Sequence, residues 1–198
     1  STQDAAAGRD LLASKGQLSK TGHGKAGFDF AKISANGEVL AANSNNWQCI
    51  LDYRTGLLWE AKTTDGGLHD VNTTYAWYNP DDNNNGGNSG QINDGNNTLA
   101  FVNAVNQAGL CGYHDWRLPD ITELQSIVDY GSNNPAIDTQ YFSPVQNDAY
   151  WSSSSFSDGV AALGVSFDYG VVRNYYKVHR FTDTVHFVRL VRSAPSSR

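Results

Sequence analysis

The sequence from residue 149 onward constrains the fold more than any other part, because its segments are strand-like and none has a helical pattern. Residues 150–153 form a short aromatic run, and residues 160–168 alternate apolar and polar side chains. A turn at Tyr169-Gly170 leads to a partner segment at residues 171–178, and residues 185–191 supply a last strand. This half of the chain predicts antiparallel sheet.

Further strands are predicted upstream. Residues 28–33 alternate apolar and polar side chains, as a strand does. Residues 47–51 and 57–60 predict a hairpin. Its turn contains Asp52 and Thr55, residue types whose side chains hydrogen-bond turn backbone.

Two helices are predicted between these strand-rich parts. The first spans residues 98–108, with Thr98 as its cap and Gly109 as its stop. The second follows Asp120, which forms a capping-box pattern with Glu123 three residues later. The order of strands, two helices and strands predicts an α+β fold, with the helices packed on antiparallel sheets joined by long irregular loops.

The longest loop is predicted at residues 65–98, which contain five Asp and neither Lys nor Arg. Its centre is too rich in Asn, Asp and Gly to hold regular structure. Carboxylate and amide oxygens suit Ca²⁺, and the candidate calcium ligands are Asp81, Asp82, Asn84 and Asp94. Because the spacing is not that of an EF-hand, a solvated insertion held by its own side-chain-to-backbone bonds is the alternative.

The length of 198 residues suits one domain with a substantial core. Residues 1–26 are small and polar, so we expect a flexible N-terminal arm followed by a single domain over residues 27–198. The chain begins with Ser and contains no Met, so we expect that its start was removed. The arm is interpreted either as a linker to a membrane anchor attached through a removed N-terminal signal, as in a lipoprotein, or as a frayed terminus.

Charge and motif content exclude several classes of protein. A net charge of -6 argues against a nucleic-acid partner, which would require a basic face. No apolar run approaches the ~20 residues of a membrane span. No nucleophile or paired base accompanies Arg117, so we expect Asp115 and Arg117 to form an ion pair or backbone bonds. We therefore expect no enzyme activity.

Several segments, taken in this order, together resemble one known family. They are residues 51–60 (LDYRTGLLWE), 108–119 (AGLCGYHDWRLP), 123–129 (ELQSIVD), 150–153 (YWSS) and 187–192 (FVRLVR). Over roughly residues 45–192 the chain resembles the family typified by the C-terminal domain of the Legionella collagen-like adhesin. This resemblance implies a C-type-lectin-like fold and an exported bacterial protein, extracellular or at the outer-membrane surface.

The same resemblance implies a disulfide between Cys49 and Cys111. Such a bond would join the end of the first helix to the strand at residues 47–51. Two buried free thiols are the alternative. A structural zinc site would need several His with paired spacing, which the chain lacks.

The resemblance also implies two alternative functions. The adhesin that typifies the family binds sulfated glycosaminoglycans through basic residues, which suggests a carbohydrate-binding domain of fixed specificity. Residues 156–187, however, contain three cations (Arg173, Lys177 and Arg180) against three Asp, and a sulfated polymer requires clustered cations. The fold is also similar to that of formylglycine-generating enzymes, whose chemistry needs reactive cysteines rather than a disulfide.

A second resemblance is to the variable proteins of diversity-generating retroelements, which use the same fold. Their C-terminal region is altered at adenines, chiefly in AAC-type codons, which can become many residues but not Glu, Gln, Trp, Met or Lys. Residues 152–192 contain no Glu, Gln, Trp or Met, and a single Lys, Lys177. Ordinary strand composition, which also disfavours Glu and Lys, is the alternative explanation.

We therefore predict a C-terminal display region at residues 152–192 that binds a protein or a cell-surface glycan. Tyr and Phe offer large contact area at low conformational cost. Six positions are predicted to be mostly core: Leu163, Val165, Phe167, Val188, Leu190 and Val191. The predicted contact residues are Phe156, Asp158, Val160, Ala162, Tyr169, Val171, Arg173, Tyr175, Tyr176, Val178, His179, Arg180, Phe181, Asp183 and His186.

Overall fold

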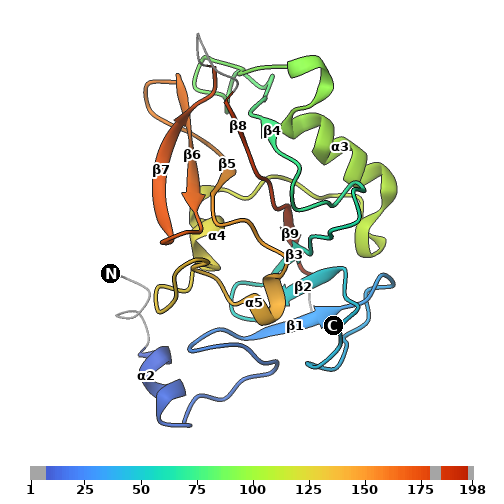
Figure 1. Cartoon of the computed structure of the whole chain (residues 1–198), viewed down its shortest axis with the longest axis vertical. Helices are drawn as coiled ribbons and strands as arrows, with labels where there is room; N and C mark the ends of the chain where they lie inside the picture. The colour runs from blue at the N-terminus through green and yellow to red at the C-terminus, as the bar shows by residue number, and fades with distance from the viewer. Residues whose placement is uncertain (1–7, 179–183, 196–198) are drawn as a thin grey trace.

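The computed structural model describes residues 8–178 and 184–195, and its elements are arranged as Figure 1 shows. The helical elements are α2 (Arg9–Ser14), η1 (Asn93–Gly95), α3 (Thr98–Ala108), η2 (Leu110–Gly112), α4 (Ile121–Ser126) and α5 (Thr139–Phe142). The strands are β1 (Phe30–Ile33), β2 (Cys49–Asp52), β3 (Leu57–Glu60), β4 (Tyr75–Ala76), β5 (Ala149–Ser155), β6 (Ala161–Ser166), β7 (Val171–Tyr176), β8 (Val185–His186) and β9 (Val191–Ser193).

The first sheet has the order β1-β2-β3-β9, so the last strand of the chain lies beside β3. β2 and β3 form the predicted hairpin, with Cys49 opposite Glu60. In the turn, the Asp52 carboxylate accepts hydrogen bonds from the Arg54 backbone N–H (2.9 Å) and from the Thr55 hydroxyl (2.7 Å). The predicted roles of Asp52 and Thr55 are confirmed.

Two further sheets come from the second half of the chain together with β4. One has the order β5-β6-β7 and the other pairs β4 with β8, all antiparallel. Phe187, just after β8, lies against the start of β5: its N–H donates to the Ala149 carbonyl (3.0 Å), and its carbonyl accepts from Trp151 (2.9 Å). The fold class is α+β, as predicted, and the arrangement is consistent with a C-type-lectin-like fold.

The first predicted helix is confirmed as α3, and Gly109 ends it with a φ of 74°. Its N-cap is Asn97 rather than Thr98, because the Asn97 side chain accepts from the Ala100 N–H (2.9 Å). The Thr98 hydroxyl instead donates to the Tyr78 carbonyl (3.0 Å) and is fully buried. Thr98 thus ties the helix to the preceding loop.

The second predicted helix is α4, and its capping box is present. The Asp120 carboxylate accepts from the Glu123 N–H (2.8 Å), and the Glu123 carboxylate accepts from the Asp120 N–H (2.9 Å). The helix packs against β5 and β6 (Figure 1), and buries Leu124 completely. No helix within the described residues is long and apolar enough to cross a membrane.

The N-terminal segment, expected as a flexible arm, is attached to the domain from residue 8 onward. Arg9 donates to the Gly27 carbonyl (3.0 Å), and the Asp10 carboxylate accepts from the Gly27 N–H (2.5 Å). Further along, the Lys25 ammonium lies 2.9 Å from the Asp129 carboxylate. These contacts join the segment to later residues, although α2 itself buries no side chain.

The implied disulfide is present: Cys49 on β2 is bonded to Cys111 on η2. In a chain-entropy description, closing a loop of this length stabilises the fold by about 4 kcal/mol. The bond lies in a buried cluster that also contains Trp77, Trp116 and Trp151. The end of α3 is thereby fixed to the first sheet and to the core beneath β5.

A buried ionic centre joins the first sheet to the C-terminal segment. One Glu60 carboxylate oxygen lies 2.8 Å from both the Lys62 ammonium and His69 Nδ1, and the other accepts from the Leu190 N–H (2.9 Å). Arg189, also fully buried, donates to the Glu60 carbonyl (2.7 Å). Burial raises the pKa of Glu60, but Lys62 and His69 more than offset it, so the pKa lies below its ordinary value.

Replacing Glu60 by Gln should destabilise the fold strongly, because Lys62 would become an unpaired buried charge. Loss of one partner from a buried ion pair costs about 3–5 kcal/mol. Urea denaturation would measure this loss in the free energy of unfolding. Arg117→Gln is the matched control, since it breaks the exposed Arg117–Glu123 pair (2.6 Å) and should cost at most about 1 kcal/mol. Equal losses would contradict the role assigned to the centre.

Candidate ligand-binding site

The predicted contact residues are mostly exposed. The structure describes eleven of the fifteen: eight are exposed, Tyr175 and His186 are half-buried, and Ala162 is buried. His179, Arg180, Phe181 and Asp183 lie outside the described residues. We call the eight exposed side chains the display surface: Phe156, Asp158, Val160, Tyr169, Val171, Arg173, Tyr176 and Val178.

The display surface lies mainly on the outer strand of a sheet and on the turns at the two ends of that sheet. β7 is hydrogen-bonded to β6 on one side and forms the edge of the sheet (Figure 1). Along β7 only Val172 and Tyr175 are half-buried, and the other four residues are exposed. The irregular alternation noted in the sequence follows from this edge position, since few side chains of β7 have a core to cover.

Ala162 was expected to be exposed, and this expectation is wrong. β6 is the central strand of its sheet, and Ala162 lies opposite Tyr175 in the ladder and in the cluster that contains Trp151. Five of the six predicted core residues, Val165, Phe167, Val188, Leu190 and Val191, are buried, which confirms them, whereas Leu163 is half-buried.

The two half-buried candidates form an aromatic group beneath the sheet. The His186 ring lies 4.6 Å from Trp151 and 4.4 Å from Tyr175, centroid to centroid. Gly164 makes room for it, because a Cβ there would lie 3.1 Å from the Tyr175 ring and 2.6 Å from the Tyr150 carbonyl oxygen. Tyr175 and His186 therefore support the display surface from below.

The structure adds one residue that the site prediction did not include. Lys177, at the end of β7, is fully buried. Its ammonium donates to the carbonyls of Asn85 (2.6 Å) and Asn88 (3.1 Å) and to the Ser155 hydroxyl (2.8 Å). It also lies 4.2 Å from the Trp77 ring centroid. Lys177 thus holds the Asn-rich loop against the display region. In the sequence, the feature that could have indicated this role is that Lys177 is the single Lys of residues 152–192.

The Asn-rich loop is held by bonds among its own polar groups. The Asp81 carboxylate accepts from the Asn83 side-chain amide (3.1 Å) and from the Asn84 side-chain amide (2.6 Å). These bonds, the one from Asn84 first, hold the pKa of Asp81 below its usual value. Asp82 accepts from the Asn85 amide (3.0 Å).

The predicted calcium ligands are not brought together with other acidic groups. In residues 8–178 and 184–195, no three His, Cys, Asp or Glu side chains are grouped so that they could hold a metal ion. Asp81 and Asp82 bond to neighbouring Asn residues, whereas Asp94 lies in η1 with a left-handed φ of 48°. The geometry matches the alternative of an internally bonded insertion.

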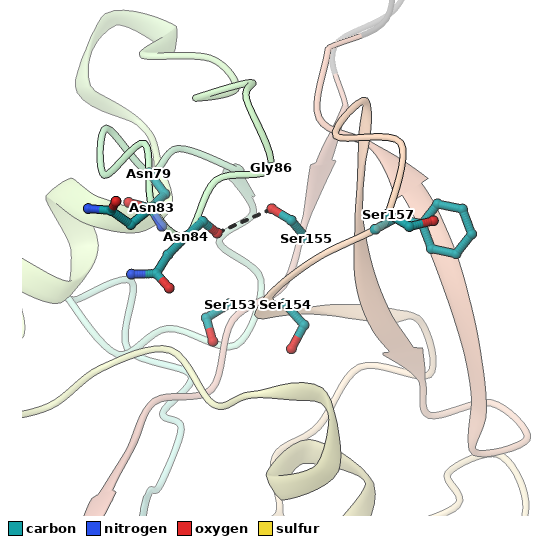
Figure 2. A pocket seen from close by; sticks show the side chains of 9 residues that line it. Asn79, Asn83, Asn84, Gly86, Ser153, Ser154, Ser155 and Ser157 are labelled. Atoms are coloured by element: carbon teal, nitrogen blue, oxygen red, sulfur yellow. Dashed lines mark hydrogen bonds between the residues drawn. The ribbon is translucent and has the colours of Figure 1, made fainter.

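An open cleft of about 650 Å³ lies between this loop and the end of β5. Figure 2 shows Asn79, Asn83 and Asn84 on the loop side and Ser153 and Ser154 on the strand side. The Ser155 hydroxyl bridges the two sides by donating to the Asn84 carbonyl (3.4 Å). Gly86, Phe156 and Ser157 complete the lining, so that no charged side chain belongs to it.

The cations of the display region are mostly buried. Of the four in its described part, Lys177, Arg189 and Arg192 are buried and only Arg173 is exposed. Arg192 pairs with Asp115 (2.6 Å). Arg117 pairs with Glu123 and also donates to the Leu118 carbonyl (3.2 Å). Of the two alternatives expected for Asp115 and Arg117, the backbone bond is therefore present for Arg117, whereas each residue forms its ion pair with another partner.

Replacing Lys177 by Met should release the Asn-rich loop while keeping the apolar stem. Two backbone carbonyls would lose their donor, which costs about 1–3 kcal/mol for buried groups. Hydrogen exchange at residues 79–90 should therefore rise, and the free energy of unfolding should fall. Arg173→Met, which removes an exposed cation of the same strand, should leave exchange in the loop unchanged. Unaltered exchange in the Lys177 variant would show that the loop does not depend on this residue.

Stability should fall as the pH falls through the range in which His186 titrates. Burial lowers the pKa of His186 from 6.5, with Asp148 opposing. As the pH falls, the unfolded chain therefore takes up the proton before the folded protein does. The stabilisation that depends on the neutral ring is complete above about pH 6.5, and it is lost as the pH falls toward the lowered pKa. His186→Gln should lose less stability than the wild type between neutral and acidic urea titrations, and an equal loss in the two proteins would contradict this role of His186.

Comparison with known proteins identifies a family. The Lcl C-terminal domain family matches residues 48–192, a segment that includes the disulfide, α3, α4 and the display surface. No curated protein and no solved structure gives a significant match. Because the matched segment covers more than half of the chain, the protein belongs to the family of the C-terminal domain of the Legionella collagen-like protein, Lcl.

Proposed function

We propose that the chain is an exported bacterial ligand-binding domain and a variable protein of a diversity-generating retroelement, with the display surface as its changeable contact area. The supporting observation is the division of residues 152–192 into exposed and buried sets. The predicted contact residues are mostly exposed, whereas the predicted core residues are mostly buried. Substitution could therefore change the contact area without altering the core.

The exposed apolar side chains also favour a binding role. Of the thirteen large hydrophobic side chains that are exposed within the described residues, six belong to the display surface: Phe156, Val160, Tyr169, Val171, Tyr176 and Val178. Such concentrations on a soluble surface mark interaction sites. Since most of the six lie on β7 or next to it, binding would not need to order a long loop, which reduces its entropic cost.

Lys177 supports the retroelement part of the proposal. Adenine-directed change of AAC-type codons does not produce Lys, and Lys177 is the single Lys of the region. It is also the residue that fastens the Asn-rich loop, so its replacement would damage the scaffold. Lys177, which adenine-directed change of AAC-type codons cannot produce, thus has a structural role. Diversification that varies only contact residues requires such structural residues to stay unchanged.

The domain family is that of an adhesin, so an external ligand at the cell surface or outside the cell fits its membership. A protein or a cell-surface glycan suits an apolar, aromatic contact area. A sulfated glycan suits it less well, because Arg173 is the single exposed cation in the described part of the region. The proposed role is binding, and the disulfide counts against formylglycine-type chemistry, which needs reactive thiols, because the two cysteines of the chain form that bond.

The neighbouring DNA provides the direct test. We expect a near-copy of the codons for residues 152–192 close to a reverse-transcriptase gene, differing from the coding sequence mainly at adenines. Absence of such a copy from the complete genome would reject the retroelement part and favour a binding domain of fixed specificity.

The display surface should tolerate substitution where the core does not. Each of the substitutions Val160→Asn, Val171→Asn and Val178→Asn should change the free energy of unfolding by about 0.5 kcal/mol or less, as at ordinary surface positions. The three are combined in one triple variant. Phe167→Ala, in the buried cluster below, should cost about 3–5 kcal/mol. Urea denaturation of both variants compares them. A triple variant as unstable as Phe167→Ala would contradict the division into changeable and fixed residues.

A further inference from the structure

We propose that the cleft between the Asn-rich loop and the end of β5 is a second binding site, for a neutral carbohydrate. Its two sides come from residues 79–86 and 153–157 (Figure 2). A volume of about 650 Å³ lies within the range of roughly 300–1,000 Å³ that is typical of small-molecule sites. It can therefore hold one or two sugar rings.

The lining offers hydrogen-bonding groups that the protein does not use. Within the described residues, the side-chain NH₂ of Asn79, the side-chain carbonyls of Asn83 and Asn84, and the hydroxyls of Ser153 and Ser157 have no partner. Amides and hydroxyls together supply donors and acceptors. A molecule with many hydroxyl groups, each of which both donates and accepts, matches such a lining.

The absence of charge from the lining selects neutral ligands. None of the nine lining residues is ionisable. The two neighbouring carboxylates of the loop already accept hydrogen bonds, Asp81 from Asn83 and Asn84 and Asp82 from Asn85. Binding of a sulfated or phosphorylated group would need nearby cations, and the ammonium of Lys177 is buried and bonded to backbone carbonyls.

The sides of the cleft are held in place before any ligand binds. Lys177 bonds both to the loop and to the Ser155 hydroxyl. Gly86 and Gly159 bring the loop into backbone contact with the turn before β6, where a Cβ on Gly159 would overlap the Gly86 carbonyl oxygen. On the strand side, the Ser154 hydroxyl accepts from the Ile121 N–H at the start of α4 (3.1 Å). Prior ordering of this kind lowers the cost of binding.

This site is separate from the display surface in its residues and in its consequences. Asn79, Asn83 and Asn84 precede residue 152, so the loop side of the cleft lies outside the region proposed to vary, whereas the strand side, residues 153–157, lies inside it. Of the lining residues, only Phe156 belongs to the display surface. The chain would thus combine a sugar site that is constant on its loop side with a changeable contact area next to it.

The test is a ¹⁵N chemical-shift titration of the full chain with neutral di- and trisaccharides built from glucose, galactose, mannose and N-acetylglucosamine. At least one should shift the side-chain amide of Asn84 and the backbone amides of residues 153–157. A heparin disaccharide is the charged comparison and should not shift these signals. Failure of every neutral sugar, equal binding of the heparin fragment, or shifts confined to β7 would each overturn the proposal.

Substitutions test whether the sugar binds in the cleft. Ser153→Ala removes one unpartnered hydroxyl, and the loss of a hydrogen bond should weaken the affinity roughly two- to tenfold. Ser193→Ala, an equal change at an exposed position of β9, should leave the affinity unchanged. The Val160, Val171 and Val178 triple variant should also bind the sugar normally, so failure of the cleft proposal and failure of the display proposal are distinguishable. Unaltered affinity in Ser153→Ala would exclude this binding site.

Discussion

The buried carboxylate of Glu60 is the interaction on which the arrangement of the C-terminal half depends. It is paired with Lys62 and His69, and it also accepts the backbone N–H of Leu190. Arg189 returns a hydrogen bond to the Glu60 carbonyl. An isolated buried charge would be very unfavourable, so this centre forms only when β3 and the segment before β9 are together. Its geometry therefore fixes the segment before β9 beside β3.

With this centre in place, the two ends of the display region are held at fixed positions in the core. The region leaves the core at Trp151 and returns at Phe187, and these two residues are hydrogen-bonded to each other. Between them, one face of the sheet packs on the Trp151 cluster and the other on α4. The outer strand β7 has neither support along most of its length, which explains why four of its six residues are exposed. A contact surface is thus available without weakening either core cluster.

Sequence reasoning predicted what depends on near neighbours. The Asp52 turn, the Asp120–Glu123 capping box and Gly109 are local signals, and the structure confirms them. It missed what depends on distant partners. Thr98 bonds to Tyr78 across a loop, and Asn97 takes the cap instead.

The same limit applies to the candidate site. Exposure along a sheet is decided by which strand is central, so Ala162 could not be placed from alternation alone. The partners of Lys177 lie 92 and 89 residues away in sequence, and no periodicity encodes such a contact. The lysine was noticeable only as an exception in composition.

The long Asn-rich loop is held by bonds among its own polar groups and by one buried lysine. Its side-chain amides bond to its own carboxylates, while the Lys177 ammonium donates to the backbone carbonyls of Asn85 and Asn88. The anchor lies between Tyr176 and Val178, two exposed members of the display surface. If the region varies as proposed, its contacts can change on both sides of Lys177 while this residue stays, so the anchor limits which positions can be substituted.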